Sequence, residues 1–410
     1  MRIQKKISSM RHKAVDWDQC VMLLIMASLF LPSEFAVLPG AAMMMRVCQS
    51  AQLRARMMQV PFVKCLMLFC ISLMTVTVMN GDLVSIGVGA SLCLAMLAAV
   101  YLRVCIQRTM LYRMLEFCCY GAIYSLLIAV VQACTFGTSE GYRCTSVFAN
   151  PNYYAMMMEF TVLAAMYLWM RRGDKPWLYA MAILACLLGL FLSNSRTAMV
   201  AAVASALILT LLLRNTKAFL IGMSVCIVVG VAILMVPGAL RLTGMETELH
   251  TRTQLWKMAL EGFLQSPLVG QGAWAFSRVA AASPVIVEVH AHNLLLELLL
   301  SSGLMGVAML GLYFYHNHKS AYQLYRAKKD EGLMALLVSV TMALGLHSLM
   351  DVTIFAPQAA LFFMMVCSVS GLAERQKAPA RVPALTPVPL PAWIGPHLRD
   401  GLANRQKERA

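Results

Sequence analysis

Long runs of apolar residues, separated by short polar segments, recur along most of the chain. They lie at 19–45, 60–79, 83–101, 114–133, 153–170, 176–193, 198–213, 218–236, 293–315, 334–350 and 357–373. Most are long enough to cross the ~30 Å hydrocarbon core of a bilayer as a helix. Because a backbone in lipid must satisfy its own hydrogen bonds, the pattern predicts an all-α, polytopic membrane helix bundle.

Basic residues decide the predicted topology. The first run is either one long span or a short hairpin that turns at Pro32-Ser33-Glu34. With a hairpin and a cytoplasmic N-terminus, most arginines and lysines of the short connections fall on the cytoplasmic side. A single span would place them outside, against the positive-inside rule. The hairpin is therefore favoured, which predicts about twelve transmembrane helices with both termini in the cytoplasm.

The same pattern divides the chain into four parts. Residues 1–18 are a basic cytoplasmic N-terminus leading into an uncleaved first anchor, and 19–133 hold the N-terminal transmembrane helices. Residues 134–373 form a core that includes a long external loop at 237–291. The Pro-rich basic tail, 374–410, is expected to be cytoplasmic and disordered.

Helical spacing of apolar residues recurs inside the external loop. It is formed by Leu255, Trp256, Ala259, Leu260 and Phe263. The spacing predicts an amphipathic helix lying on the outer membrane interface.

Composition agrees with a membrane protein, because 60% of the residues are hydrophobic and 13% are charged. The net charge of +15 is explained by the cytoplasmic connections, so no nucleic-acid partner is expected. The 13 cysteines lie mostly in apolar runs and form no CxxC metal motif. Cys134 and Cys144 fall outside the membrane, and whether they form a disulfide is left open.

Two histidines directly precede the run at 293–315, within the segment VHAHN (289–293). His290 and His292 are two residues apart, so they do not share a helix face and are expected on an extended entry to the helix. A neutral imidazole there can act as a general base, with Asn293 capping the helix or orienting a neighbour. A purely structural helix cap and a zinc site are the alternatives, and zinc lacks HExxH or a third ligand in sequence.

Two external arginines are candidates for binding an anion. Arg196 lies at the outer end of the run 176–193, and Arg252 begins the predicted interfacial helix. A guanidinium can grip a phosphate with two parallel hydrogen bonds. The alternative is that both side chains reach to lipid headgroups.

Three further patterns are less specific. The segment SPLVGQG (266–272) predicts a turn and is no nucleotide loop. His347 and Asp351 are four residues apart, which allows them to pair and orient a base, or to form a structural buried pair. The histidines at 316–318 are expected at headgroup level on the cytoplasmic side.

The order of these motifs resembles the O-antigen ligase and polymerase family over roughly residues 145–372. The matching pieces are NPNYY (150–154), SNSRT (193–197), Arg252 followed by Trp256, SPLVGQG (266–272) with Phe276, HAHN (290–293) followed by Glu297 and SGLMG (302–306), and HSLMD (347–351). Before residue 145 only the pattern of spans agrees.

The resemblance implies a GT-C-like membrane glycosyltransferase with its active site on the outer face of the cytoplasmic (inner) membrane. Such enzymes transfer a glycan from a polyprenyl (undecaprenyl) pyrophosphate carrier to an acceptor hydroxyl, in lipopolysaccharide and cell-surface polysaccharide biosynthesis. A single displacement would invert the anomeric carbon. Neither a cofactor nor a metal is expected, because guanidinium groups can stabilise the leaving pyrophosphate.

The resemblance also assigns roles to residues. His292 is expected to be the base, with His290 as second choice, and Arg196 and Arg252 are expected to hold the pyrophosphate. Supporting roles are expected for Asn152, Asn293, Glu297, His347 and Asp351.

The acceptor separates a ligase from a polymerase or a protein O-glycan ligase of the same family, and the ligase is slightly favoured. A flippase or transporter of lipid-linked glycan is the alternative from another class, because such proteins also have bundles of about twelve spans. Polar residues that gather at one face, and not at the midplane, favour the enzyme.

Overall fold

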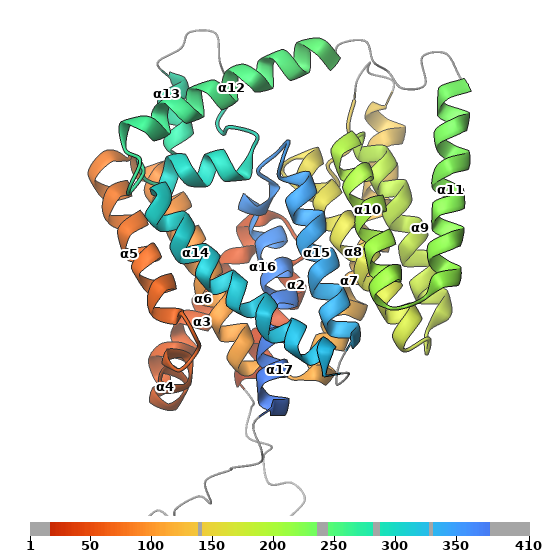
Figure 1. Ribbon diagram of the computed structural model, residues 1–410, viewed down its shortest axis with the longest axis horizontal. Helices are drawn as coiled ribbons and strands as arrows, with labels where there is room; N and C mark the ends of the chain where they lie inside the picture. Colours follow the sequence, from red (N-terminus) through yellow and green to blue (C-terminus); the bar gives the residue numbers. More distant parts are fainter. Residues whose placement is uncertain (1–16, 138–141, 236–244, 282–287, 328–330, 378–410) are drawn as a thin grey trace, which may run out of the picture. The chain divides into compact units, whose positions relative to one another are not determined.

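A computed structural model describes residues 17–137, 142–235, 245–281, 288–327 and 331–377, and within these ranges all regular secondary structure is helical (Figure 1). The prediction of an all-α chain is thereby confirmed for the described residues. The chain divides into two units, Met1–Ala373 and Glu374–Ala410. The disorder predicted for the tail concerns mainly residues 378–410, which lie outside the described residues.

The helices follow the predicted apolar runs closely. Their bounds are α2 Trp17–Ser28, η1 Ser33–Ala36, α3 Val37–Gln49, α4 Ala51–Met58, α5 Val63–Asn80, α6 Leu83–Cys105, α7 Arg108–Phe136, α8 Pro151–Arg171, α9 Pro176–Ser193, α10 Arg196–Leu212, α11 Thr216–Met235, α12 Met245–Gln265, α13 Ala275–Ala281, α14 Leu294–Arg326, α15 Glu331–His347, η2 Thr353–Phe355, α16 Pro357–Cys367 and α17 Val369–Lys377.

Among the described residues, five helices are long and apolar enough to cross a membrane. They are α5, α6, α7, α9 and α14, the last over Leu294–Gln323. Shorter apolar helices accompany them, including α2, α10, α15 and a stretch over Pro357–Leu372. The chain thus has the helices of a multi-pass membrane protein, and the count of about twelve spans stays a prediction.

The first apolar run is interrupted, as the hairpin interpretation requires. Helix α2 ends at Ser28 and α3 begins at Val37, with Pro32 and the short helix η1 between them. The two helices pack against each other. Proline lacks the amide hydrogen that a continuous helix needs, which accounts for the break.

Two helices, α4 and α13, were not predicted from the pattern. Helix α4 buries only Leu53 and Met57 and is capped by Ser50, whose side chain accepts from Leu53 N. So short a helix has too few apolar positions to show a period. A helix is present where the interfacial helix was predicted, as α12, and its position at a membrane interface stays a prediction. Leu255 and Ala259 of α12 pack in a small apolar cluster with residues of α13 and α14.

Helix α8 is one of the deeply buried helices of the bundle. It packs against α7, α9, α10 and α15, and its residues from Tyr154 to Ala165 are all buried. One acidic residue, Glu159, lies in this stretch. The N-terminus of α8 and the C-terminus of α15 bring Asn152 and Asp351 together, which places the candidate site at this end of the helices.

A loop with the sequence SPLVGQG forms a wedge against α14. The amides of Leu304 and Met305 donate to the carbonyls of Pro267 and Leu268, and Gln271 N donates to Leu300 O. Helix α14 is broken at Gly303, whose φ is 63° and ψ −173°. The turn predicted from the two glycines therefore forms hydrogen bonds with the backbone amides and the carbonyl of α14 that have no partner inside the helix at the break.

We expect Gly303→Ala to destabilise the protein. A Cβ atom at this position would lie 2.3 Å from Leu268 O, and the backbone conformation is one that favours glycine. The substitution should lower the free energy of unfolding by about 2 kcal/mol or more. Thermal unfolding of the detergent-purified protein measures the effect.

Gly311→Ala is the matched control, because Gly311 lies in the same helix and a Cβ atom there would meet nothing within 4 Å. Equal melting temperatures for the two variants would contradict the prediction, because they would show that the contact between Gly303 and the 266–272 loop does not require a glycine.

Candidate functional site

A short loop before α14 carries the two candidate histidines. It is held by Glu297, a fully buried residue of the first turn of α14, whose Oε2 accepts from Ala291 N at 2.9 Å. Asn293 caps α14 by accepting from Leu296 N, and its amide donates to Leu349 O. His292 has a φ of 50°, in the left-handed region that non-glycine residues seldom adopt. Such backbone strain persists only where the surroundings fix it, and it is commonest at functional sites.

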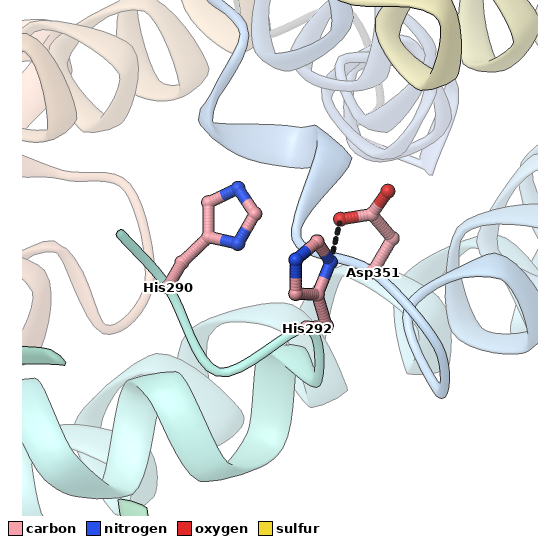
Figure 2. A group of neighbouring side chains, drawn as sticks. All are labelled: His290, His292 and Asp351. Atoms are coloured by element: carbon pink, nitrogen blue, oxygen red, sulfur yellow. Dashed lines mark hydrogen bonds and ion pairs between the residues drawn. The ribbon is translucent and has the colours of Figure 1, made fainter. Parts of the chain in front are cut away.

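The ring of His292 lies between two carboxylates. Its Nδ1 is 3.0 Å from Asp351 Oδ1 and its Nε2 is 3.1 Å from Glu288 Oε2. Figure 2 shows the contact with Asp351, which comes from the segment after α15. Asp351 is buried, whereas the side chain of Glu288 is 49% exposed. The inner carboxylate therefore fixes the ring, and the outer one can move aside to free Nε2.

Electrostatics favour the protonated form of His292. Burial alone lowers the pKa of its imidazole, but the hydrogen bonds and charges of Asp351 and Glu288 outweigh burial and raise the pKa above its ordinary value. For Asp351, burial raises the pKa, and the hydrogen bond and charge of His292 lower it well below the usual range. Asp351 is therefore a carboxylate throughout the physiological range, and it orients a histidine that holds its proton strongly.

His290 lies beside His292, with ring centroids 4.4 Å apart and the rings nearly perpendicular (Figure 2). It is buried, and its Nδ1 has no hydrogen-bond partner. Burial and the neighbouring His292 lower the pKa of His290, so it is neutral when His292 is charged.

The same three side chains are the residues of the described chain that could hold a metal ion. Ligand atoms of His290, His292 and Asp351 all lie within 4.8 Å of one another. Two imidazoles and a carboxylate are a donor set that zinc accepts. The fold thus places Asp351 beside the two histidines as a possible third ligand, which the sequence did not reveal.

A polar cavity of about 140 Å³ lies on the other side of Asp351. Its lining includes the following ionisable residues: Arg143, Arg196, Glu248, Arg252, His347 and Asp351. Three guanidinium groups around so small a space favour an anion with several oxygens. The predicted pair, Arg196 and Arg252, does lie together here, and Arg143 joins them.

Each arginine is fixed differently. Arg143 donates from Nε to Ser193 O at 2.9 Å and from Nη2 to Asn152 Oδ1 at 2.5 Å. Arg252, on α12, donates to the carbonyl of Met350 and pairs with Glu248 at 3.1 Å. Helix α12 runs across the end of the bundle at which α14 begins (Figure 1), and its Arg252 lines the cavity. Arg196 pairs with Glu248 at 3.6 Å and is half-exposed.

Asn152 joins the arginine cavity to the histidines. Its Oδ1 accepts from Arg143, and its Nδ2 donates to Asp351 Oδ2. The other carboxylate oxygen of Asp351 contacts His292 and accepts from Val352 N. One continuous chain of hydrogen bonds therefore runs from an arginine in the cavity to the candidate base.

His347 and Asp351 do not pair with each other, although their spacing allowed it. Helix α15 ends at His347, so Asp351 lies beyond the helix and contacts His292. The Nδ1 of His347 instead lies 2.9 Å from Glu159 Oε2 of α8. The spacing argument does not hold here because it assumes a helix that continues for four more residues.

Sequence reasoning gave no role to four ionisable residues that the structure brings to this site or beside it, which are Arg143, Glu159, Glu248 and Glu288. A lone glutamate within a predicted span was the one available signal for Glu159, because such residues are costly in lipid.

Other sequence expectations concern residues away from the site. Cys134 and Cys144 are both free thiols, and Cys144 is buried with its Sγ 3.4 Å from Ala129 O. His318 bonds to Phe314 O and to Thr341 Oγ1, so it anchors α14 to α15.

A comparison with known families agrees with the geometry. Residues 180–311 match the family model described as O-antigen ligase. Among curated proteins, none matches the chain. The matched region includes Arg196, Arg252, His290, His292 and Glu297, whereas Asp351 lies outside it. The match over these residues supports an assignment to the O-antigen ligase family, and with it a membrane glycan-ligating or glycan-polymerising function in general.

Proposed function

We propose that the protein transfers a glycan from a polyprenyl pyrophosphate carrier to an acceptor hydroxyl, with O-antigen ligase-like chemistry. The observation that carries the proposal is the connected pair of sites. A cavity lined by three arginines is joined through Asn152 and Asp351 to His292. An anionic leaving group and a base side by side are what such a transfer requires.

The arginine cavity suits the pyrophosphate. As the bond from the anomeric carbon to the phosphate oxygen breaks, negative charge grows on the leaving group. Arg143, Arg196 and Arg252 would hold that group and stabilise the charge. Glu248 pairs with Arg196 and Arg252 and is half-exposed, so an entering phosphate can replace it.

His292 suits the acceptor. The acceptor oxygen forms a bond with the anomeric carbon, and its proton passes to Nε2 of the imidazole. Asp351 at Nδ1 stabilises the imidazolium that results. The displaced product is the polyprenyl pyrophosphate, and one displacement inverts the anomeric centre.

An apolar groove is consistent with a carrier that has a lipid chain. A cavity of about 430 Å³ is lined largely by apolar residues of α3, α6 and α16, together with Trp274 and Tyr153. Tyr153, which lines the groove, is next in sequence to Asn152, which lines the arginine cavity. An isoprenoid chain in the groove would place its pyrophosphate between the arginines.

We further propose that the site faces the outer side of the cytoplasmic membrane, with both termini in the cytoplasm. The distribution of arginines and lysines between the connections supports this orientation. A polymerase or a protein O-glycan ligase would use the same site with a different acceptor. A flippase is the alternative from another class, and its loss would trap lipid-linked glycan inside, whereas loss of a transferase would accumulate it outside.

The first prediction of this proposal concerns transfer in vitro. Purified protein is given undecaprenyl pyrophosphate-linked glycan and candidate acceptors, and the product is followed by gel and mass spectrometry. Wild type should transfer glycan. His292→Ala and Arg252→Ala should reduce the rate about a hundredfold or more, because each removes a group that acts in the transition state.

Lys257→Ala is the matched control for Arg252→Ala, because Lys257 lies on the same helix with its side chain 77% exposed. Normal transfer by His292→Ala would refute the base assignment. No transfer by wild type to any acceptor, with donor intact, would favour the flippase.

A second prediction concerns metal. We expect transfer to be unchanged after extensive dialysis against EDTA, because guanidinium groups can supply the positive charge. Loss of activity with EDTA, restored by zinc, would instead assign His290, His292 and Asp351 to a metal centre.

A third prediction concerns pH. A base works only when deprotonated, so activity should fall as the pH drops through the pKa of His292. That pKa is raised, so the acid limb of the kcat/KM profile should lie above the ordinary histidine value of 6.5. Asp351→Asn removes the carboxylate that raises the pKa, and should move the limb to lower pH while reducing the plateau rate. An acid limb that does not move in this variant would contradict the pairing.

A further inference from the structure

A buried ion pair lies beneath the arginine cavity and has no part in the transfer as described so far. It joins Glu159, in the middle of α8, to His347, at the end of α15, with 2.9 Å between Oε2 and Nδ1. Their side chains are 0% and 1% exposed. Ionisable groups among apolar helices are costly, and they persist mainly where they have a function.

One ring nitrogen of this pair is left without a partner. His347 Nε2 is buried and forms no hydrogen bond, and His347 contributes to the lining of the cavity that holds Arg143, Arg196 and Arg252. Its neighbour across the cavity, Asp351, already contacts His292 and accepts from Asn152 and Val352 N. Nε2 is therefore available to something that enters the cavity.

Charge balance decides what Nε2 can offer. A net charge buried among apolar side chains is expensive, so the pair is most stable when its total charge is zero. In that state one proton lies between Nδ1 and Oε2, and a second proton is on either Nε2 or Glu159 Oε1. Oε1 is buried without a partner, so a hydrogen there would have no acceptor, whereas a hydrogen on Nε2 faces the polar cavity. The pair therefore presents an N–H donor to the cavity and not a lone pair.

We propose that His347 is a further binding residue for the donor, and that its Nε2–H donates to a phosphate oxygen held by the three arginines. Glu159 acts through His347 as a positioning residue. This inference rests on the proposed function, since it takes the anion to be the carrier's pyrophosphate. It adds a contact from the membrane side of the cavity, where no arginine lies in the adjoining stretches of α8 and α15.

The test compares two variants that both lack the buried carboxylate. In Glu159→Gln, the amide can donate to Nδ1, so Nε2 keeps its hydrogen. In Glu159→Gln combined with His347→Leu, the donor is lost and no unpaired charge is buried. Binding of undecaprenyl pyrophosphate and of the neutral undecaprenol to the purified full chain is measured in detergent.

We expect Glu159→Gln to bind undecaprenyl pyrophosphate within about threefold of wild type. The double variant should bind it about tenfold to a hundredfold more weakly, the loss typical of a hydrogen bond to a charged group. Its affinity for undecaprenol should be unchanged, because the neutral lipid has no phosphate. His318→Leu, which removes a partly buried histidine of α14 with both nitrogens bonded, is the control and should bind both lipids as wild type does.

Two results would overturn the inference. One is equal affinity of the double variant and Glu159→Gln for the pyrophosphate. The other is an equal loss of both lipids in the double variant, which would show a structural role only. Failure of the proposed function has a different signature, because wild type itself would then not prefer the pyrophosphate over undecaprenol.

Discussion

The carboxylate of Asp351 is the contact on which the site depends. One oxygen meets His292 Nδ1 and Val352 N, and the other accepts from Asn152. Three segments far apart in sequence are joined there: the start of α8, the loop before α14 and the turn after α15. A buried carboxylate needs several donors to remain charged, and two of these donors, His292 and Asn152, belong to the site proposed for the transfer. The same contacts therefore keep Asp351 charged and orient the ring of His292.

The loop that carries His292 is held from two further directions. Glu297 fixes Ala291 N from the first turn of α14, and Asn293 caps the same helix while reaching Leu349 O. One turn further on, the 266–272 wedge enters at the break in α14. These contacts fix the strained backbone of His292, whose conformation would otherwise be unfavourable. A rigid base beside a rigid arginine cavity leaves the half-exposed carboxylates Glu248 and Glu288 as the groups that substrates would displace.

The site has ionisable pairs both at its surface and in its buried interior. The exposed glutamates neutralise Arg196, Arg252 and His292 at the surface, and Glu159 pairs with His347 in the apolar interior. Glu248 lies beside Arg196 and Arg252, and Glu288 and Asp351 lie beside His292, so much of the positive charge of the site is balanced before a substrate enters. Water screens the outer pairs and not the inner one. The inner pair therefore retains its geometry, and the outer pairs can exchange partners with a phosphate at little cost.

The sequence by itself determined the helices and the candidate residues at their ends. Apolar runs mark spans because lipid accepts no unsatisfied backbone, and this is a local property of each run. The family resemblance pointed to Arg196, Arg252 and His292. All three lie within residues 180–311, which match the family model described as O-antigen ligase. Helices α4 and α13 were missed because short helices with few apolar positions leave no period.

Only the tertiary structure decided which residues meet. It paired His347 with Glu159 instead of Asp351, because α15 ends at His347, and it brought Arg143 into the cavity through the start of α8. Such partners depend on where helices end and how they pack. Those outcomes depend on contacts between segments up to about two hundred positions apart, so no local pattern along the chain could predict them.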